Sequence, residues 1–127
     1  MKTALDGRPY YRWHLSDLNY SDGVLSLDVR SDSQANSSAF KDDRYLVVFS
    51  DVVFHQVFDE CMQKKDEGGR AGGTLGLHQT SSLLNYLRDH TAILHCAGND
   101  VRHYSLLTAL ECVHVITRGE PKLTQID

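Results

Sequence analysis

The sequence predicts a single α+β domain over residues 1–127, in which a mainly antiparallel, twisted sheet of about six or seven strands packs on one main helix at about residues 81–89. Several short runs alternate apolar and polar side chains, which is the period of a strand with one buried face. One run instead spaces its leucines three or four residues apart, as on one face of a helix. The length of 127 residues suits one domain with a substantial core.

The first half of the chain contains three strand patterns. Tyr10–Leu15 and Val24–Arg30 each alternate apolar with polar residues, and the turn-forming residues Ser21–Gly23 separate them, which predicts a hairpin. Arg44–Phe49 holds four apolar residues in succession, which indicates a central strand. Ser31–Asp43 is rich in Ser, Asn and Asp, so we expect a long loop there.

Two predictions compete for Val52–Met62. Apolar pairs recur every four residues, which favours an amphipathic helix that starts near Ser50. The same stretch is rich in Val and Phe, which favours a strand in a tight hairpin with Arg44–Phe49. We favour the strand, through about Asp59, because of the resemblance described below.

The middle of the chain begins with a charged, glycine-rich connector, Gln63–Gly73. Its glycines do not have the spacing of a phosphate-binding or dinucleotide-binding loop, so we expect no cofactor. Thr74–His78 reads as a short strand. Thr80 or Ser81 then caps a helix that runs to about residue 89, with three leucines on one face.

Strand-favouring residues dominate the segment near the C-terminus. His103–Thr108 and Glu111–Thr117 are alternating runs that flank a short break, which predicts a β-hairpin. Thr91–Asp100, before it, is expected to be a connection. Gly119–Pro121 should end the hairpin and leave the last residues as a tail.

The two faces of this hairpin differ in chemistry. If it turns at Ala109 and Leu110, Ser105 lies opposite His114. One face is then apolar and should belong to the core, with Tyr104, Leu106, Val113 and Val115. The other face mixes polar and apolar residues, namely His103, Ser105, Leu107, Cys112, His114 and Ile116.

Composition limits the classes of function. The formal net charge is −4, and the acidic excess lies in residues 1–67, which argues against binding to nucleic acid or to an anionic membrane. No run approaches the roughly 18 apolar residues of a membrane span, and the polar N-terminus lacks the apolar core of a signal peptide. The three cysteines form no CxxC pair, which fits a reducing compartment. We therefore expect a cytoplasmic protein.

The histidines and cysteines offer two kinds of chemistry. His103, Cys112 and His114 share a face of the hairpin and are ligand types for zinc, although no compact ligand motif is present and histidines without a metal are commoner. Cys96 beside His95 suggests a nucleophile, but adjacent side chains point apart, so the base would have to come from His103 or His114. A buried, inert cysteine is the ordinary alternative.

Acidic pairs recur along the first half of the chain. As catalytic dyads they lack a partner pattern, and as charges at loop ends they are ordinary. Flanking the strands, they could also form a recognition surface for a basic protein partner. The residues of this expected surface are Asp42, Asp43, Asp59, Glu60, Asp66 and Glu67.

Several segments between residues 44 and 121 resemble small bacterial α+β proteins, many of them uncharacterised and some of them immunity proteins of contact-dependent or interbacterial toxin systems. The matching pieces are Val48-Phe49-x-x-Val52-Val53 ending in Phe58-Asp59-Glu60, Leu77-His78, Ser81-Ser82-Leu83-Leu84-x-Tyr86-Leu87, His103-Tyr104-x-Leu106-x-Thr108, Val113-x-Val115 and Glu120-Pro121. In such proteins the segment ending in the acidic pair is a strand. The resemblance carries no catalytic residues.

These features favour a non-catalytic, cytoplasmic immunity protein that occludes the active site of a cognate bacterial toxin, a basic protein domain, through its acidic surface. One alternative is a small enzyme or a metal-binding protein that uses His95, Cys96, His103 and His114. Another is a homo-oligomer in which an exposed edge strand pairs with its copy. We expect no nucleic-acid or membrane partner.

Overall fold

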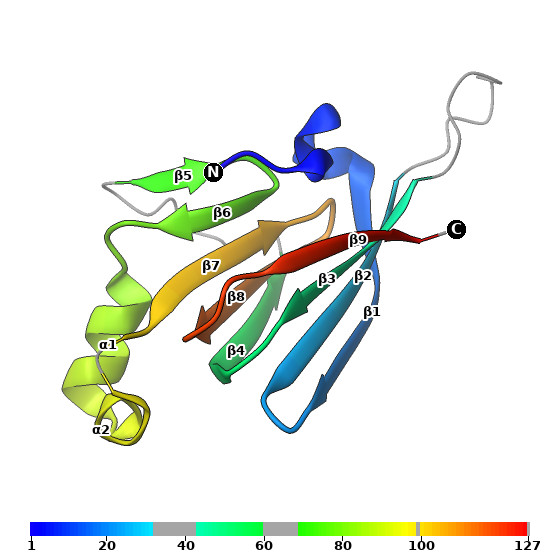
Figure 1. Ribbon diagram of the computed structural model, residues 1–127. Helices are drawn as coiled ribbons and strands as arrows, with labels where there is room; N and C mark the ends of the chain where they lie inside the picture. The colour runs from blue at the N-terminus through cyan, green and yellow to red at the C-terminus, as the bar shows by residue number, and fades with distance from the viewer. Residues whose placement is uncertain (32–42, 60–68, 99, 127) are drawn as a thin grey trace, which may run out of the picture.

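A computed structural model describes residues 1–31, 43–59, 69–98 and 100–126, although not the side chains of residues 96 and 97. In these ranges nine β-strands form two antiparallel sheets that pack face to face (Figure 1). The mostly antiparallel architecture that the sequence predicts is confirmed. A single sheet of six or seven strands is not, because the strands divide between a four-stranded and a five-stranded sheet.

The four-stranded sheet has the order β1-β2-β3-β9. Its strands are β1 (Trp13–Ser21), β2 (Val24–Ser31), β3 (Arg44–Phe49) and β9 (Lys122–Ile126). Asp22 and Gly23 both have positive φ, at 51° and 79°, which is the geometry of a tight hairpin turn whose twist matches that of its strands. The expected hairpin of the first half is therefore confirmed.

The five-stranded sheet has the order β4-β8-β7-β6-β5. Its strands are β4 (Val52–Asp59), β5 (Arg70–Gly72), β6 (Leu75–His78), β7 (Arg102–Leu107) and β8 (Glu111–Thr117). Residues 52–59 thus form a strand, as favoured above, and the helix alternative is wrong over these residues. The predicted register of the C-terminal hairpin is confirmed, with Ser105 opposite His114.

The chain crosses between the sheets at Ser50 and Asp51. Asp51 has a φ of 53°, and the amide of Val52 donates to the carbonyl of Gly23 over 2.8 Å, which ties the start of β4 to the β1–β2 turn. Val52–Asp59 therefore does not return along β3, as the predicted tight hairpin required. It pairs instead with β8, more than fifty residues later in the chain.

The core lies between the two sheets. Its buried members come from the inward side of both sheets and from the N-terminal segment: Leu5, Trp13, Leu25, Leu27, Val29, Val47, Phe49, Val52, Leu75, Tyr104, Leu106, Val113 and Val115. The apolar face predicted for the C-terminal hairpin is therefore the core face. We call this side of the five-stranded sheet its inner face and the opposite side its outer face.

Short helices flank the sheets. The 3-10 turns η1 (Ala4–Gly7) and η2 (Tyr10–Arg12) lie at one end of the five-stranded sheet, and α1 (Ser82–His90) and α2 (Ile93–Ala97) lie together at the other (Figure 1). The hydroxyl of Ser81, one of the two predicted caps, accepts from the amide of Leu84 over 2.9 Å and caps α1.

Four local predictions differ from the structure. Residues 10–12 form η2, so β1 begins only at Trp13. The expected connection 91–100 contains α2, and the expected tail contains β9, which pairs with β3. Residues 70–72 of the expected connector form β5. Most of the expected loop at 31–43 lies outside the described residues.

Candidate functional site

The outer face of the five-stranded sheet holds three buried histidines side by side. His78, His103 and His114 have relative exposures of 6%, 1% and 5%, and one ring nitrogen from each lies within 4.8 Å of the others. We call these three residues the histidine cluster. It is the one group of three or more possible metal-ligating residues in the part of the chain that the structure describes.

Strand register explains why these residues meet. His78 on β6 is directly opposite His103 on β7, and their rings stack with centroids 3.8 Å apart and planes at 7°. His114 on β8 is opposite Ser105, two residues along β7, so it is the diagonal neighbour of His103. The prediction that His103 and His114 share one face of the hairpin, with Ser105 opposite His114, is thereby confirmed.

A chain of hydrogen bonds runs through the cluster. Ser81 Oγ lies 2.6 Å from His103 Nδ1, and His103 Nε2 lies 2.8 Å from His114 Nδ1. His114 Nε2 then lies 3.5 Å from the thiol of Cys112. The chain can be satisfied with every group neutral, with all protons donated either from serine toward cysteine or in the reverse direction.

Arg70 closes the cluster on the side of β5. Its Nε donates to Ser105 Oγ over 2.6 Å, and that hydroxyl also lies 2.8 Å from His78 Nε2. The remaining guanidinium donors bind backbone carbonyls, including that of Gly73 at 2.6 Å. A Cβ at Gly76 would lie 2.5 Å from the guanidinium carbon, so only glycine leaves room for this arginine. Arg70 thus fastens the β5–β6 hairpin to β7.

The environment keeps His103 neutral and the Cys112 thiol protonated. Burial, with smaller effects of His78, His114 and Arg70, lowers the pKa of His103 to about 3. Burial also raises the pKa of the Cys112 thiol to about 11, against a smaller opposing effect of Arg70. At neutral pH the thiol is therefore protonated, and it is fully buried. A protonated, inaccessible thiol is a poor nucleophile, so Cys112 fits a packing role.

The structure brings together the metal-ligand set that the sequence offered as an alternative, His103, Cys112 and His114, but their ligand atoms do not converge on one point. Cys112 and His103 contact opposite nitrogens of the His114 ring, so the three cannot bind one ion while His114 uses one nitrogen. The residue that does converge with the two histidines is His78. Sequence reasoning missed it because the pairing of β6 with β7 is not visible in either strand alone.

The other histidine and cysteine of the alternative enzyme site are arranged differently. His95 lies exposed on α2, whereas His103 and His114 are buried. The side chain of Cys96 lies outside the described part of the structure. The combination of His95 with the two buried histidines therefore gains no support from the described geometry.

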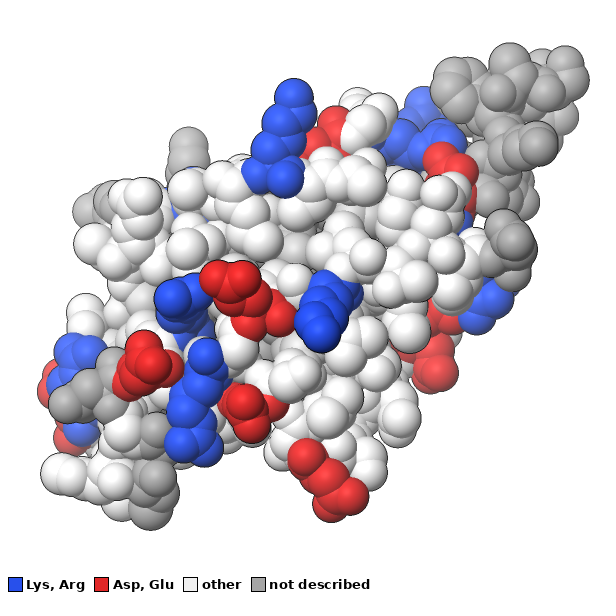
Figure 2. All heavy atoms as spheres, viewed as in Figure 1, with Lys and Arg blue, Asp and Glu red and all other residues white. Residues whose placement is uncertain are grey.

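Only two of the six expected partner-binding residues are described. Asp43 forms an ion pair with Arg8 at 2.6 Å, and Asp59 is exposed at the end of β4. Residues 42, 60, 66 and 67 lie outside the described ranges. On the face shown in Figure 2, basic and acidic side chains are interspersed rather than gathered by sign.

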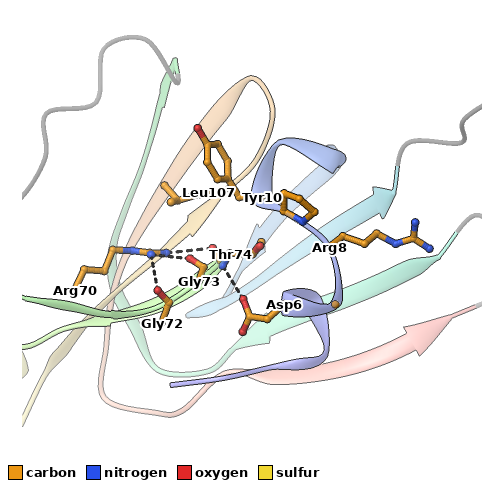
Figure 3. A pocket seen from close by; sticks show the side chains of 10 residues that line it. Asp6, Arg8, Tyr10, Arg70, Gly72, Gly73, Thr74 and Leu107 are labelled. Atoms are coloured by element: carbon orange, nitrogen blue, oxygen red, sulfur yellow. Dashed lines mark hydrogen bonds between the residues drawn. The ribbon is translucent and has the colours of Figure 1, made fainter.

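A pocket of about 550 Å³ lies between the N-terminal turns and the β5–β6 hairpin (Figure 3). Its polar side chains already form hydrogen bonds within the protein. The carboxylate of Asp6 accepts from the amides of Thr3 and Thr74 at 2.8 and 3.0 Å, and Arg70 binds the carbonyls of Gly73 and Thr74. Arg8 points away from Arg70. The pocket has the size of a ligand site, but its charged groups are committed to internal contacts.

Among the described residues, no helix is both long enough and apolar enough to span a bilayer. Comparison with protein-family models, with curated proteins and with solved structures finds no match to this chain.

Proposed function

We propose that this chain is a non-catalytic protein-binding domain, and specifically a cytoplasmic immunity protein that neutralises a cognate bacterial toxin. One observation carries the proposal. The histidine cluster and Cys112 are buried, and burial keeps His103 neutral and the Cys112 thiol protonated at neutral pH. These buried groups stabilise the fold and are not accessible to a substrate, so we favour recognition of a partner at the protein surface.

The topology supports one end of the molecule as the binding surface. Asp43 immediately precedes β3, and β4 leads back from the crossover to Asp59, so both carboxylates lie at the end of the sheets remote from the crossover. Glu111 is opposite Asp59 and adds a third carboxylate there. Asp42 and Glu60 of the expected surface are adjacent in sequence to Asp43 and Asp59. We call Asp43, Asp59 and Glu111 the acidic end.

This charge would act mainly on the rate of encounter with a basic toxin domain. Exposed carboxylates attract a basic partner over several ångströms and discourage acidic competitors, while affinity depends on the contacts made afterwards. The ion pair between Arg8 and Asp43 is partly exposed, so a partner's cation can compete for that carboxylate at small cost.

Co-expression with the products of the genes adjacent to its own tests the proposal. We expect one of those products to stop growth when expressed alone, and this protein to restore growth and to co-purify with it. If no adjacent product is toxic or bound, the immunity proposal is wrong.

A charge-reversal pair tests the acidic end once a partner is in hand. Asp59→Lys should lower the association rate constant about tenfold at low salt, with a smaller effect at high salt. Glu120→Lys is the matched control, because Glu120 follows β8 near the crossover, at the opposite end. Equal effects of the two variants would remove the acidic end from the proposal.

A further inference from the structure

We propose that His78, His103 and His114 form a binding site for one first-row transition-metal ion that prefers imidazole nitrogen, such as zinc(II). The proposal goes beyond toxin binding and concerns the fold itself. Three adjacent strands each contribute one buried histidine, and one nitrogen of each ring lies within 4.8 Å of the others. Imidazole is a ligand for zinc, copper and nickel, whereas calcium and magnesium require oxygen.

Each ring is also held from outside the cluster. The hydroxyl of Ser81 contacts His103 Nδ1, the hydroxyl of Ser105 contacts His78 Nε2, and the thiol of Cys112 contacts His114 Nε2. In metal sites the second nitrogen of a ligating histidine is usually engaged in this way, which fixes the tautomer and the ring orientation. Cys112 is then a supporting group behind His114, and not the ligand that the sequence suggested.

Binding requires the rings to move, because the three nitrogens are spread over as much as 4.8 Å. His103 Nε2 and His114 Nδ1 are 2.8 Å apart, as in a hydrogen bond. Two nitrogens on a tetrahedral ion with bonds of about 2.0–2.1 Å are about 3.3 Å apart, so the pair must open by about 0.5 Å. An ion also lies in the plane of each ligating ring, so one of the two stacked rings, His78 or His103, must turn about its Cβ–Cγ bond. This torsion has a broad energy profile.

The electrostatics select the kind of ion. The group contains no carboxylate among the described residues, and Arg70 lies nearby, so a cation held only by charge is excluded. His103 is buried, with a relative exposure of 1%. The same burial opposes any added charge. A proton binds one nitrogen, whereas a metal ion binds all three. The free energy of these three bonds must exceed the cost of burying the charge of the ion.

Metal content of untagged protein is the direct test. Protein exposed to zinc(II) and then passed through a desalting column should retain one ion per chain by elemental analysis. Cobalt(II) bound in its place should give the intense visible absorption of tetrahedral coordination, which reports geometry without any substitution. Folded wild-type protein that retains neither ion would overturn the proposal.

Single substitutions identify the ligands. His78→Gln, His103→Gln and His114→Gln should each lower zinc affinity by at least 100-fold, since loss of an outer partner alone typically costs 10–100-fold. His90→Gln and His95→Gln are matched controls, because both side chains are exposed on the helices. The near-ultraviolet circular dichroism of buried Trp13 checks folding. Zinc binding kept by a folded cluster variant, or lost in a control, contradicts the assignment, and the cobalt spectrum decides if a variant does not fold.

Discussion

The two faces of the five-stranded sheet are built from the same strands and are buried by different means. On the inner face, Tyr104, Leu106, Val113 and Val115 pack against the other sheet through apolar contacts, which have no preferred direction. On the outer face, His103, Ser105 and His114 are also buried, but directed hydrogen bonds join His103 to His114 and Ser105 to His78. An apolar face loses stability in proportion to the volume removed, whereas a polar face fails when one donor or acceptor loses its partner.

The largest expected effect is on the inner face. Leu106→Ala removes a fully buried side chain from the middle of the core and should lower the free energy of unfolding by about 2–5 kcal/mol. Urea denaturation followed by tryptophan fluorescence measures it. Leu110→Ala, in the turn of the same hairpin and 65% exposed, should change stability by less than about 0.5 kcal/mol. Similar losses for the two variants would mean that the hairpin is not packed as described.

The second-largest effect should come from breaking the hydrogen-bonded chain on the outer face. His103→Leu introduces an apolar side chain of similar size and removes the hydrogen-bond partner that Ser81 and His114 share, so we expect a loss of about 1–3 kcal/mol. His114→Leu should behave similarly. The double variant should lose less than the sum of the single losses, because the second substitution breaks a chain already broken. Additive losses would show that the two histidines stabilise the fold independently.

Acid should lower the stability of the protein through the outer face, where His103 is buried. The folded pKa of His103, about 3, is below its unfolded value of 6.5, so the unfolded chain binds more protons between these values. The contribution of His103 to the free energy of unfolding is therefore fully present above pH 6.5 and is lost as the pH is lowered. At pH 5 the loss from this residue is about 2 kcal/mol. Urea denaturation of metal-free protein from pH 8 to pH 5 measures the slope. His103→Leu should have a shallower slope, and an unchanged slope would rule out this residue as the cause.

The smallest expected effect is in the reactivity of Cys112. Because it is fully buried and burial raises its pKa to about 11, the native protein at pH 8 should leave Cys112 unmodified by iodoacetamide. In concentrated urea the same residue should react readily. Peptide mapping by mass spectrometry follows Cys112 separately from the other cysteines. Rapid alkylation in the native state would mean that the outer face opens to solvent.

Local sequence pattern was enough to determine the inner face. Alternation in His103–Thr108 and Glu111–Thr117 assigned four core residues correctly, because side chains on a strand alternate with a period of two whatever the strand pairs with. The helix cap was narrowed to Thr80 or Ser81 for the same kind of reason, since a capping hydroxyl acts within one turn of its own helix, and Ser81 is the cap.

Beyond the two predicted hairpins, only the tertiary structure decided which strands pair. β4 pairs with β8 and β9 with β3, and neither pairing leaves a local signal, because both join segments more than fifty residues apart. The positive φ at Asp51 that sends β4 to the other sheet is a property of one residue in its context. The histidine cluster depends on the same long-range register. His103 and His114 were recognised as neighbours within their hairpin, but His78 joins them only because β6 lies beside β7.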